Sequence, residues 1–201
     1  RDSSNPVDII AHYIYKLSGL PKNQVIGTGT AIDSARLQNM IAQTVNVDPR
    51  SVHAYSMGEH GDSQMVPWST VTIAGKPFYD VIADNKELVG DVDLDELVYR
   101  TTQEGWEIFN RKGTTYYGIA TACVGVIKAI LNDENRIIPV STLLEGEYGE
   151  RDVYAGVPTV LNRSGAYDVL EIHMTPGELA RFKESTRVIR EYTDRIMKLN
   201  L

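Results

Sequence analysis

With 201 residues, 42% of them hydrophobic and 23% charged, the chain has the size of one globular domain, or of one domain with part of another. Its net charge of −7 excludes a general nucleic-acid binder, which needs basic patches. No stretch approaches the roughly 20 apolar residues of a membrane span. No signal peptide opens the chain, and the single cysteine, Cys123, excludes an internal disulfide and fits a reducing cytosol.

The first third of the chain predicts two helices and a short strand. Pro6, in a first turn, and Gly19, just past the end, delimit the apolar run VDIIAHYIYKLS as a helix. Residues 24–27 (QVIG) follow as a short strand. Apolar side chains at helical spacing then predict a helix over 33–45, with Asp33 near its start.

The middle of the chain predicts two strands and two helices. Residues 51–60 and 69–75 are typical of strands, with a polar, glycine-containing loop around residue 60. Residues 93–112 predict a polar amphipathic helix. Residues 115–131 are apolar nearly all round, which predicts a buried helix.

The last third predicts three strands and a long terminal helix. Strand-like runs lie around 137–143, 152–161 and 167–173. The sequence from Thr175 to Glu178 has a capping-box pattern, and one apolar face follows it at positions 179, 182, 189, 192 and 196. The order of helices and antiparallel-looking strands predicts an α+β domain.

His60, within GEHGDS, is a candidate acid–base residue. Glycines near it free the backbone, and imidazole is the side chain whose ordinary pKa lies nearest neutrality. The alternative is an ordinary histidine of a surface loop, and this residue alone does not decide between the two.

Asp33 and Arg36 are three positions apart, which puts them on about the same face of a helix. An aspartate beside a histidine fixes its tautomer and stabilises its protonated form. An arginine on that face can hold a carboxylate through two parallel hydrogen bonds. The alternative is a helix-capping aspartate and a solvated arginine.

Two more positions are candidates for lining a pocket. Thr115 begins the predicted buried helix, where its hydroxyl either faces a small pocket or caps the helix. Asn5 precedes Pro6, and such a bond can be cis at a tight turn; the alternative is turn chemistry alone.

No nucleotide or metal motif is predicted. The run Gly27-Thr28-Gly29 begins like a GxGxxG phosphate loop but lacks its third glycine and a surrounding βαβ unit. No group of cysteines and histidines has the spacing of a zinc site.

The order and spacing of five short motifs resemble the L-lactate dehydrogenases of bacteria, in the lactate/malate dehydrogenase family. The motifs are SNPVD, VIGTGTAIDSAR, GEHGDS, KGTTYYGIA and ILNDEN. The similarity runs from about Ser4 to the end of the terminal helix. It implies the α+β substrate-binding and catalytic domain of that family over residues 29–201, preceded in residues 1–28 by the end of an NAD-binding Rossmann domain.

The resemblance implies roles for the charged candidates. His60 matches the family's proton donor and acceptor. Asp33 matches its carboxylate partner, and Arg36 matches the arginine that binds the substrate carboxylate.

It also implies the cofactor contacts and the reaction. Asn5 matches an asparagine that contacts the substrate oxygen near the nicotinamide, and Thr115 and Ile119 match residues that line the substrate and nicotinamide pocket. The implied activity is reduction of pyruvate to L-lactate by NADH, in a cytoplasmic homotetramer.

Two positions concern regulation. Many bacterial relatives are activated by fructose 1,6-bisphosphate through an arginine two places after the substrate arginine and a histidine seven places before the catalytic one. His53 matches the histidine, but Gln38 stands at the arginine position. Because Gln38 lacks the fixed positive charge of that arginine, we expect weak or absent activation.

In this family the glycine-rich dinucleotide loop, the acidic residue that holds the ribose and the mobile catalytic loop lie upstream of Asn5. Because the chain begins with Arg1 rather than Met, we expect a truncated or processed product. Because these three upstream parts are missing from the sequence, we expect it to bind NAD poorly by itself.

Three alternatives remain open. Malate dehydrogenases share the same acid–base logic, but their loop usually has GGHG where Glu59 makes GEHG here. Enzymes for bulkier 2-hydroxy acids such as hydroxyisocaproate also carry GEHG and GTGT. The third alternative is a non-catalytic piece that acts only in assembly.

Overall fold

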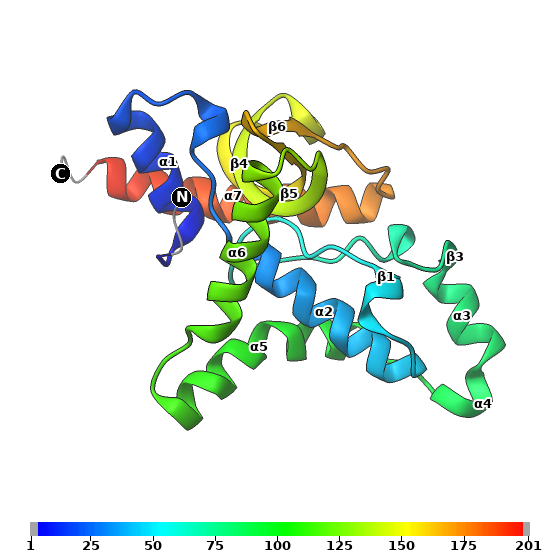
Figure 1. Cartoon of the computed structure of the whole chain (residues 1–201). Coiled ribbons are helices and arrows are strands. Elements are labelled where there is room, and N and C mark those ends of the chain that lie inside the picture. Colours follow the sequence, from blue (N-terminus) through cyan, green and yellow to red (C-terminus); the bar gives the residue numbers. More distant parts are fainter. Residues whose placement is uncertain (1–3, 199–201) are drawn as a thin grey trace.

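A computed structural model describes residues 4–198 as a mixture of helices and antiparallel strands, which confirms the predicted α+β class (Figure 1). The helices are α1 (Val7–Ser18), α2 (Gly29–Val45), α3 (Phe78–Asp84), α4 (Lys86–Val89), α5 (Leu94–Lys112), α6 (Tyr117–Leu131) and α7 (Pro176–Met197). The strands are β1 (Val52–His53), β2 (Thr72–Ile73), β3 (Lys76–Pro77), β4 (Arg136–Glu145), β5 (Arg151–Asn162) and β6 (Gly165–Val169). Short 3₁₀ helices lie at Lys22–Gln24, Pro49–Ser51, Trp68–Thr70 and Glu147–Gly149. Residues 1–3 and 199–201, which fall within the two expected domain segments, lie outside the described residues.

The larger sheet is the antiparallel meander β4–β5–β6, with β5 in the centre. Residues 153–159 of β5 are buried without interruption, because α1, α6 and α7 all contact this strand while its two edges pair with β4 and β6. A strand covered on both faces has a nearly continuous apolar sequence, as this one does. Helices α1 and α2 both contact β4 and β5, so the sheet holds these two helices in place.

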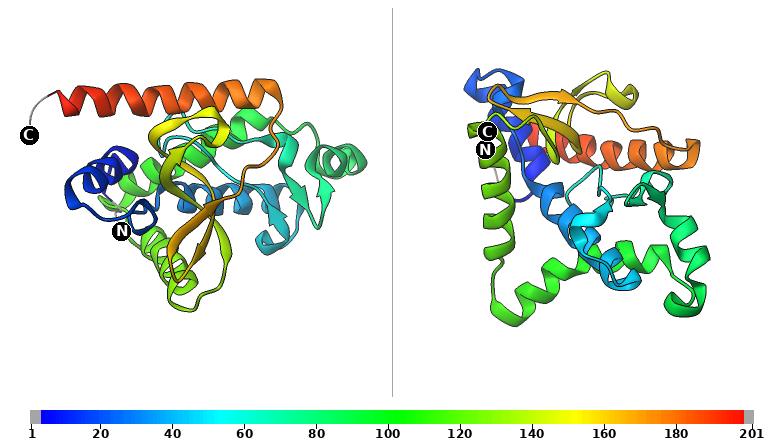
Figure 2. Two further views of the ribbon diagram at one scale, coloured as in Figure 1. Left: turned by 90° about the horizontal axis from the view of Figure 1, so that it is seen from above. Right: turned by 45° about the vertical axis from the view of Figure 1, so that its right-hand side comes forward.

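Helix α7 begins as its sequence predicts. The Thr175 hydroxyl accepts a hydrogen bond from the Glu178 amide at 3.3 Å, and the Glu178 carboxylate accepts one from the Thr175 amide at 2.8 Å. Figure 2 shows α7 extending across the molecule, past the sheet and α1. Phe182 and Ile189 are buried on its predicted apolar face, whereas Tyr192 is 49% exposed.

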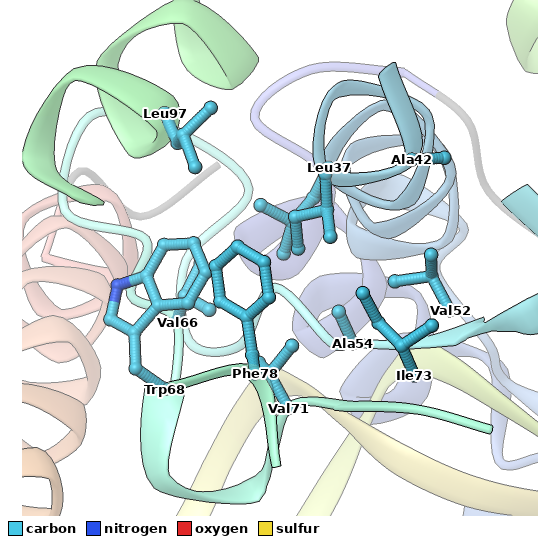
Figure 3. Close-up of a cluster of buried hydrophobic side chains, with 11 residues drawn as sticks. Leu37, Ala42, Val52, Ala54, Val66, Trp68, Val71, Ile73, Phe78 and Leu97 are labelled. Carbon is cyan, nitrogen blue, oxygen red and sulfur yellow. The ribbon is translucent and has the colours of Figure 1, made fainter. Parts of the chain in front are cut away.

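A second hydrophobic core lies between α2, α5 and the β1–β2–β3 segment (Figure 3). Leu37 enters it from α2 and Leu97 from α5. The rings of Trp68 and Phe78 stack in it with centroids 5.7 Å apart. This core fixes α2, the helix that carries Asp33 and Arg36, against the rest of the fold.

The strands expected at 51–60 and 69–75 are much shorter than predicted. Only β1 and β2, two residues each, pair with one another, and β3 completes this small sheet. Further along, the chain is held by the single bridges Met57–Met65 and Gly58–Gly156. Glycines interrupt this segment, and contacts with β5 hold it in place of a continuous ladder of hydrogen bonds between strands. The helices α3 and α4 were not predicted at all.

Two boundaries near the start also differ from the prediction. The QVIG run forms no strand, because Gly27 makes a single bridge to Ser141 before the chain enters a helix. That helix, α2, begins at Gly29 rather than at residue 33. Asp33 therefore lies inside α2 and does not cap it.

Helix α6 is less buried than its composition predicts. It begins at Tyr117, so Thr115 lies in the segment before it rather than at its first position. Of its residues only Val126 and Ala129 are buried, while Tyr117, Val124 and Leu131 are 72%, 48% and 68% exposed. An apolar composition shows that a helix needs a partner, but not whether the partner belongs to the same chain. Most of this apolar surface has no covering element among the described residues.

Candidate active site

One cavity of about 470 Å³ brings together residues from four parts of the chain. Its lining residues come from the start of α1, from α2, from the loop before Met65 and from the α5–α6 corner. Figure 1 shows this corner lying away from the sheet. All six candidates for substrate and cofactor chemistry line it: Asn5, Asp33, Arg36, His60, Thr115 and Ile119. The Asn5–Pro6 bond is cis, as the sequence allowed.

His60 and Asp33 contact one another in the lining of this cavity. The Nδ1 atom of His60 lies 2.5 Å from Oδ2 of Asp33, whose side chain is 2% exposed. The other oxygen of Asp33, Oδ1, accepts a hydrogen bond from Nη1 of Arg36 at 3.3 Å. A carboxylate on Nδ1 requires a proton there, so Nε2 is the nitrogen of His60 that can exchange a proton with another group.

The environment of His60 favours its protonated form. Burial lowers the pKa of this imidazole, but the hydrogen bond and the charge of Asp33, together with the charge of Asp8, outweigh burial, so that the pKa is raised above its ordinary value of 6.5. The ring is therefore protonated over more of the neutral pH range than an exposed histidine.

Glycines allow His60 to reach this position. A Cβ atom on Gly29 would lie 2.4 Å from Cβ of His60, so only glycine at the start of α2 admits the imidazole. Gly58 has a φ of +87°, and a Cβ atom there would lie 2.3 Å from Oγ of Ser185. Gly58 also exchanges two backbone hydrogen bonds with Gly156 of β5, at 2.9 and 2.8 Å. The run Gly27-Thr28-Gly29, which begins like a phosphate loop, therefore allows close packing around His60.

The rest of the GEHGDS loop is held by its own side chains. The Glu59 carboxylate accepts hydrogen bonds from the amide and the hydroxyl of Ser63, at 3.1 and 2.5 Å. The Glu59 amide donates to Ser185 of α7 at 2.8 Å. Glu59 therefore closes the loop and does not line the cavity.

Sequence reasoning missed the contribution of α5. Thr102, Gly105, Trp106 and Phe109 line the cavity, at the spacing of one helical face. A Cβ atom on Gly105 would lie 3.4 Å from Nη1 of Arg36, so α5 approaches the guanidinium closely. The spacing was visible in the sequence, but nothing there indicates which face of α5 meets α2.

Gln64 was also missed. Its Oε1 accepts a hydrogen bond from the Ser56 hydroxyl at 2.5 Å, and its Nε2 donates to the Thr102 hydroxyl at 2.7 Å. This side chain joins the His60 loop to α5 across the cavity.

The two regulatory candidates lie elsewhere. His53 and Gln38 line a second cavity of about 940 Å³, together with Arg50 and Arg136. The Gln38 amide donates a hydrogen bond to the Ala54 carbonyl at 3.0 Å, so it is engaged with the backbone beside β1.

Residues 4–198 contain neither a metal-binding cluster nor a membrane-spanning helix. No group of three or more histidine, cysteine or acidic side chains in that range is arranged to hold a metal ion. None of the helices described there is both long and apolar enough to cross a membrane.

Comparisons with known proteins agree with the resemblance seen in the motifs. Residues 30–199 match the family described as lactate/malate dehydrogenase, alpha/beta C-terminal domain. The chain is 52% identical over 190 residues to L-lactate dehydrogenase 3 of Bacillus cereus and 47% identical over 194 residues to L-lactate dehydrogenase 1 of Bifidobacterium longum, covering 94% and 96% of this chain. It spans about 60% of the length of these curated relatives. The ligand-bound minor L-lactate dehydrogenase of Enterococcus mundtii superposes with a TM-score of 0.91 and 41% identity, over 96% of this chain and 62% of that one. The chain therefore belongs to the lactate/malate dehydrogenase family, and its residues 30–199 correspond to the C-terminal domain of that family.

Proposed function

We propose that this chain supplies the acid–base and substrate-binding residues of an NAD-dependent L-lactate dehydrogenase, which interconverts pyruvate and L-lactate. The observation that carries the proposal is the continuous chain of contacts from Arg36 through Asp33 to His60 within one cavity. The names of the relatives support the choice of substrate.

Arg36 would bind the substrate carboxylate. Its side chain is 12% exposed, and its Nη1 contacts Asp33, which orients the guanidinium in the cavity. The planar group has further N–H donors that match the two oxygens of a carboxylate. Substrate bound in this way has its ketone oxygen facing His60.

His60 would donate the proton. The imidazolium, held through Nδ1 by Asp33, gives the proton on Nε2 to the ketone oxygen as it becomes an alkoxide. Asp33 keeps its negative charge and stabilises the imidazolium before transfer. In the reverse direction, neutral His60 accepts the proton from the hydroxyl of lactate.

NADH, when bound, supplies the hydride. The cavity fits a nicotinamide ring, because its lining includes the apolar side chains of Val7, Ile32 and Ile119 as well as the amide of Asn5. Asn5 and Ile119 are the residues that would hold this end of the cofactor. We further propose that residues 1–28 are the end of the nucleotide-binding domain and 29–201 the catalytic domain, in a cytoplasmic tetramer. The complete enzyme is this chain with the dinucleotide-binding domain that the family carries upstream.

The substrate is tested by comparing kcat/KM of the complete enzyme for pyruvate, oxaloacetate and 2-ketoisocaproate, followed through NADH oxidation. We expect pyruvate to give the highest value. A preference for oxaloacetate would indicate a malate dehydrogenase, and a preference for 2-ketoisocaproate an enzyme for bulkier acids. No turnover of any of the three would support a non-catalytic role.

The chain by itself is expected to bind NADH poorly and to self-associate. Contacts with the pyrophosphate and the ribose normally come from the nucleotide-binding fingerprint. Self-association follows from the exposed apolar side chains of α6, among them Tyr117 and Leu131. Calorimetric titration of NADH into the purified chain, with light scattering in parallel, measures both. Micromolar binding by a monodisperse monomer would mean that the cofactor site is misassigned.

Fructose 1,6-bisphosphate is expected to activate the complete enzyme weakly or not at all. The neutral Gln38 offers no charge to a phosphate, and its amide already donates to Ala54. The measurement is KM for pyruvate with and without the sugar phosphate, in the wild type and in Gln38→Arg. Clear activation of the wild type at micromolar concentration would show that other residues bind the phosphate.

A further inference from the structure

Beside the acid–base pair lies a second buried carboxylate that the proposed mechanism does not use. We propose that Asp8 is a positioning residue for His60, which holds the backbone of the GEHGDS loop against α1 and places a second negative charge near the imidazole. The inference deepens the proposed function, on which it rests for the role of His60.

The contacts of Asp8 tie three elements together. Asp8 lies in the first turn of α1 and is 2% exposed. Its Oδ2 accepts a hydrogen bond from the backbone amide of His60 at 2.9 Å, and its Oδ1 accepts one from the hydroxyl of Ser141 at 2.5 Å. Ser141, on β4, is itself fixed by two backbone hydrogen bonds with Gly27, at 2.9 and 2.8 Å. Asp8 therefore connects the His60 loop to the central sheet.

The charges around His60 come from two helices. Asp33 and Arg36 face it from α2, and Asp8 faces it from α1; Glu59, on the loop itself, acts on Asp8. The β4 neighbour of Asp8, Ser141, is uncharged. Asp33 and Asp8 favour the imidazolium, while Arg36 opposes it. Asp8, on α1, therefore adds to the effect that Asp33, on α2, has on the pKa of His60.

The carboxylate of Asp8 is costly to bury as an anion, because no Lys, Arg or His side chain within residues 4–198 forms an ion pair with it. Burial raises the pKa of Asp8 to about 6, against the hydrogen bonds from Ser141 and His60, which lower it. Above that pH the carboxylate is charged, and its hydrogen bond with the His60 amide is charge-assisted.

A purely structural role makes a different prediction. An acceptor that only holds the loop can be neutral, so its replacement by asparagine would leave the titration of His60 unchanged. A charged positioning residue alters that titration even when the loop stays in place.

The first test is the titration of His60 by NMR, with histidine labelled in the ring. Each of the chain's four histidines gives a signal, and His60→Asn assigns the one sought. In Asp8→Asn, which keeps an acceptor oxygen but loses the charge, we expect the titration midpoint of His60 to fall. The matched control is Asp152→Asn, which removes an exposed carboxylate that contacts Lys16 at the other end of α1, and should leave the midpoint unchanged. An unchanged midpoint in Asp8→Asn overturns the proposal.

The second test is hydrogen exchange of the His60 amide. Asp8→Ala removes the acceptor, and we expect exchange to accelerate on the order of ten- to a hundred-fold, the usual worth of a hydrogen bond to a charged group. Asp8→Asn should accelerate it much less. Equal exchange in the wild type and Asp8→Ala overturns the proposal.

A third measurement needs no variant and covers the case in which the substitutions prevent folding. In the wild-type chain, protonation of Asp8 should move the backbone amide resonance of His60 in a step separate from the titration of its ring. A single step shared by amide and ring overturns the proposal. All three readouts concern the imidazole and amide of His60, so a lowered midpoint in a protein that does not reduce pyruvate would keep this inference and reject the proposed function.

Discussion

Replacing His60 with asparagine in the complete enzyme is expected to abolish pyruvate reduction while the fold is retained. Asparagine is polar and can still contact Asp33, but its amide neither holds nor releases a proton near neutral pH. General acid catalysis of this kind contributes about 10²–10⁴-fold to the rate. The loss is measured as kcat for NADH oxidation in the presence of pyruvate, with the thermal unfolding midpoint as the check on folding.

The matched control is His173→Asn, which changes an exposed histidine in the segment between β6 and α7. We expect it to keep wild-type activity. If His60→Asn retained activity within a few-fold of the wild type at neutral pH, His60 would not be the proton donor.

Replacing Arg36 with lysine is expected to weaken pyruvate binding strongly, although lysine keeps the positive charge of arginine. Lysine is a point charge without the planar fork of arginine, so a bidentate contact with a carboxylate becomes a single one. The contact with Asp33, now at 3.3 Å, is also altered. Losing one hydrogen bond to a charged group corresponds to a loss of roughly ten- to a hundred-fold in kcat/KM for pyruvate.

Binding of NADH should change little, because the proposed partner of Arg36 is the substrate carboxylate and not the cofactor. Steady-state kinetics with pyruvate and fluorescence titration with NADH separate the two effects. Arg187→Lys, on the exposed side of α7, is the control for the substitution itself. Equal losses for substrate and cofactor would assign Arg36 a structural role.

Local signals predicted the long helices better than the short strands β1 to β3, and they missed the short helices α3 and α4. The start of α7 depends on Thr175, Pro176 and Glu178, three neighbours whose hydrogen bonds form within one turn. The short strands β1 and β2 depend instead on which distant segment lies beside them. Met57, for example, pairs with Met65 only across the His60 loop. A pattern of alternating residues does not contain that information.

The same distinction applies to the site. Motif order indicated His60, Asp33 and Arg36, and the fold brings them into contact. Asp8 was not singled out, because its significance comes from a hydrogen bond to a residue 52 positions away. For the same reason no local feature of α5 distinguished Trp106, which lines the cavity, from the other exposed side chains around it.

The position of Asp33 between Arg36 and His60 has a consequence for how substitutions combine. Its two oxygens contact different partners: Oδ1 contacts Arg36, the proposed substrate-binding residue, and Oδ2 contacts His60, the proposed proton donor. A change at either partner therefore alters the carboxylate that the other contacts. Groups that share one hydrogen-bonded network deviate from additivity by about 0.5–3 kcal/mol. In a double-mutant cycle, the combined effect of changing Arg36 and His60 will therefore differ from the sum of the separate effects, and removing the Asp33 carboxylate will eliminate that difference.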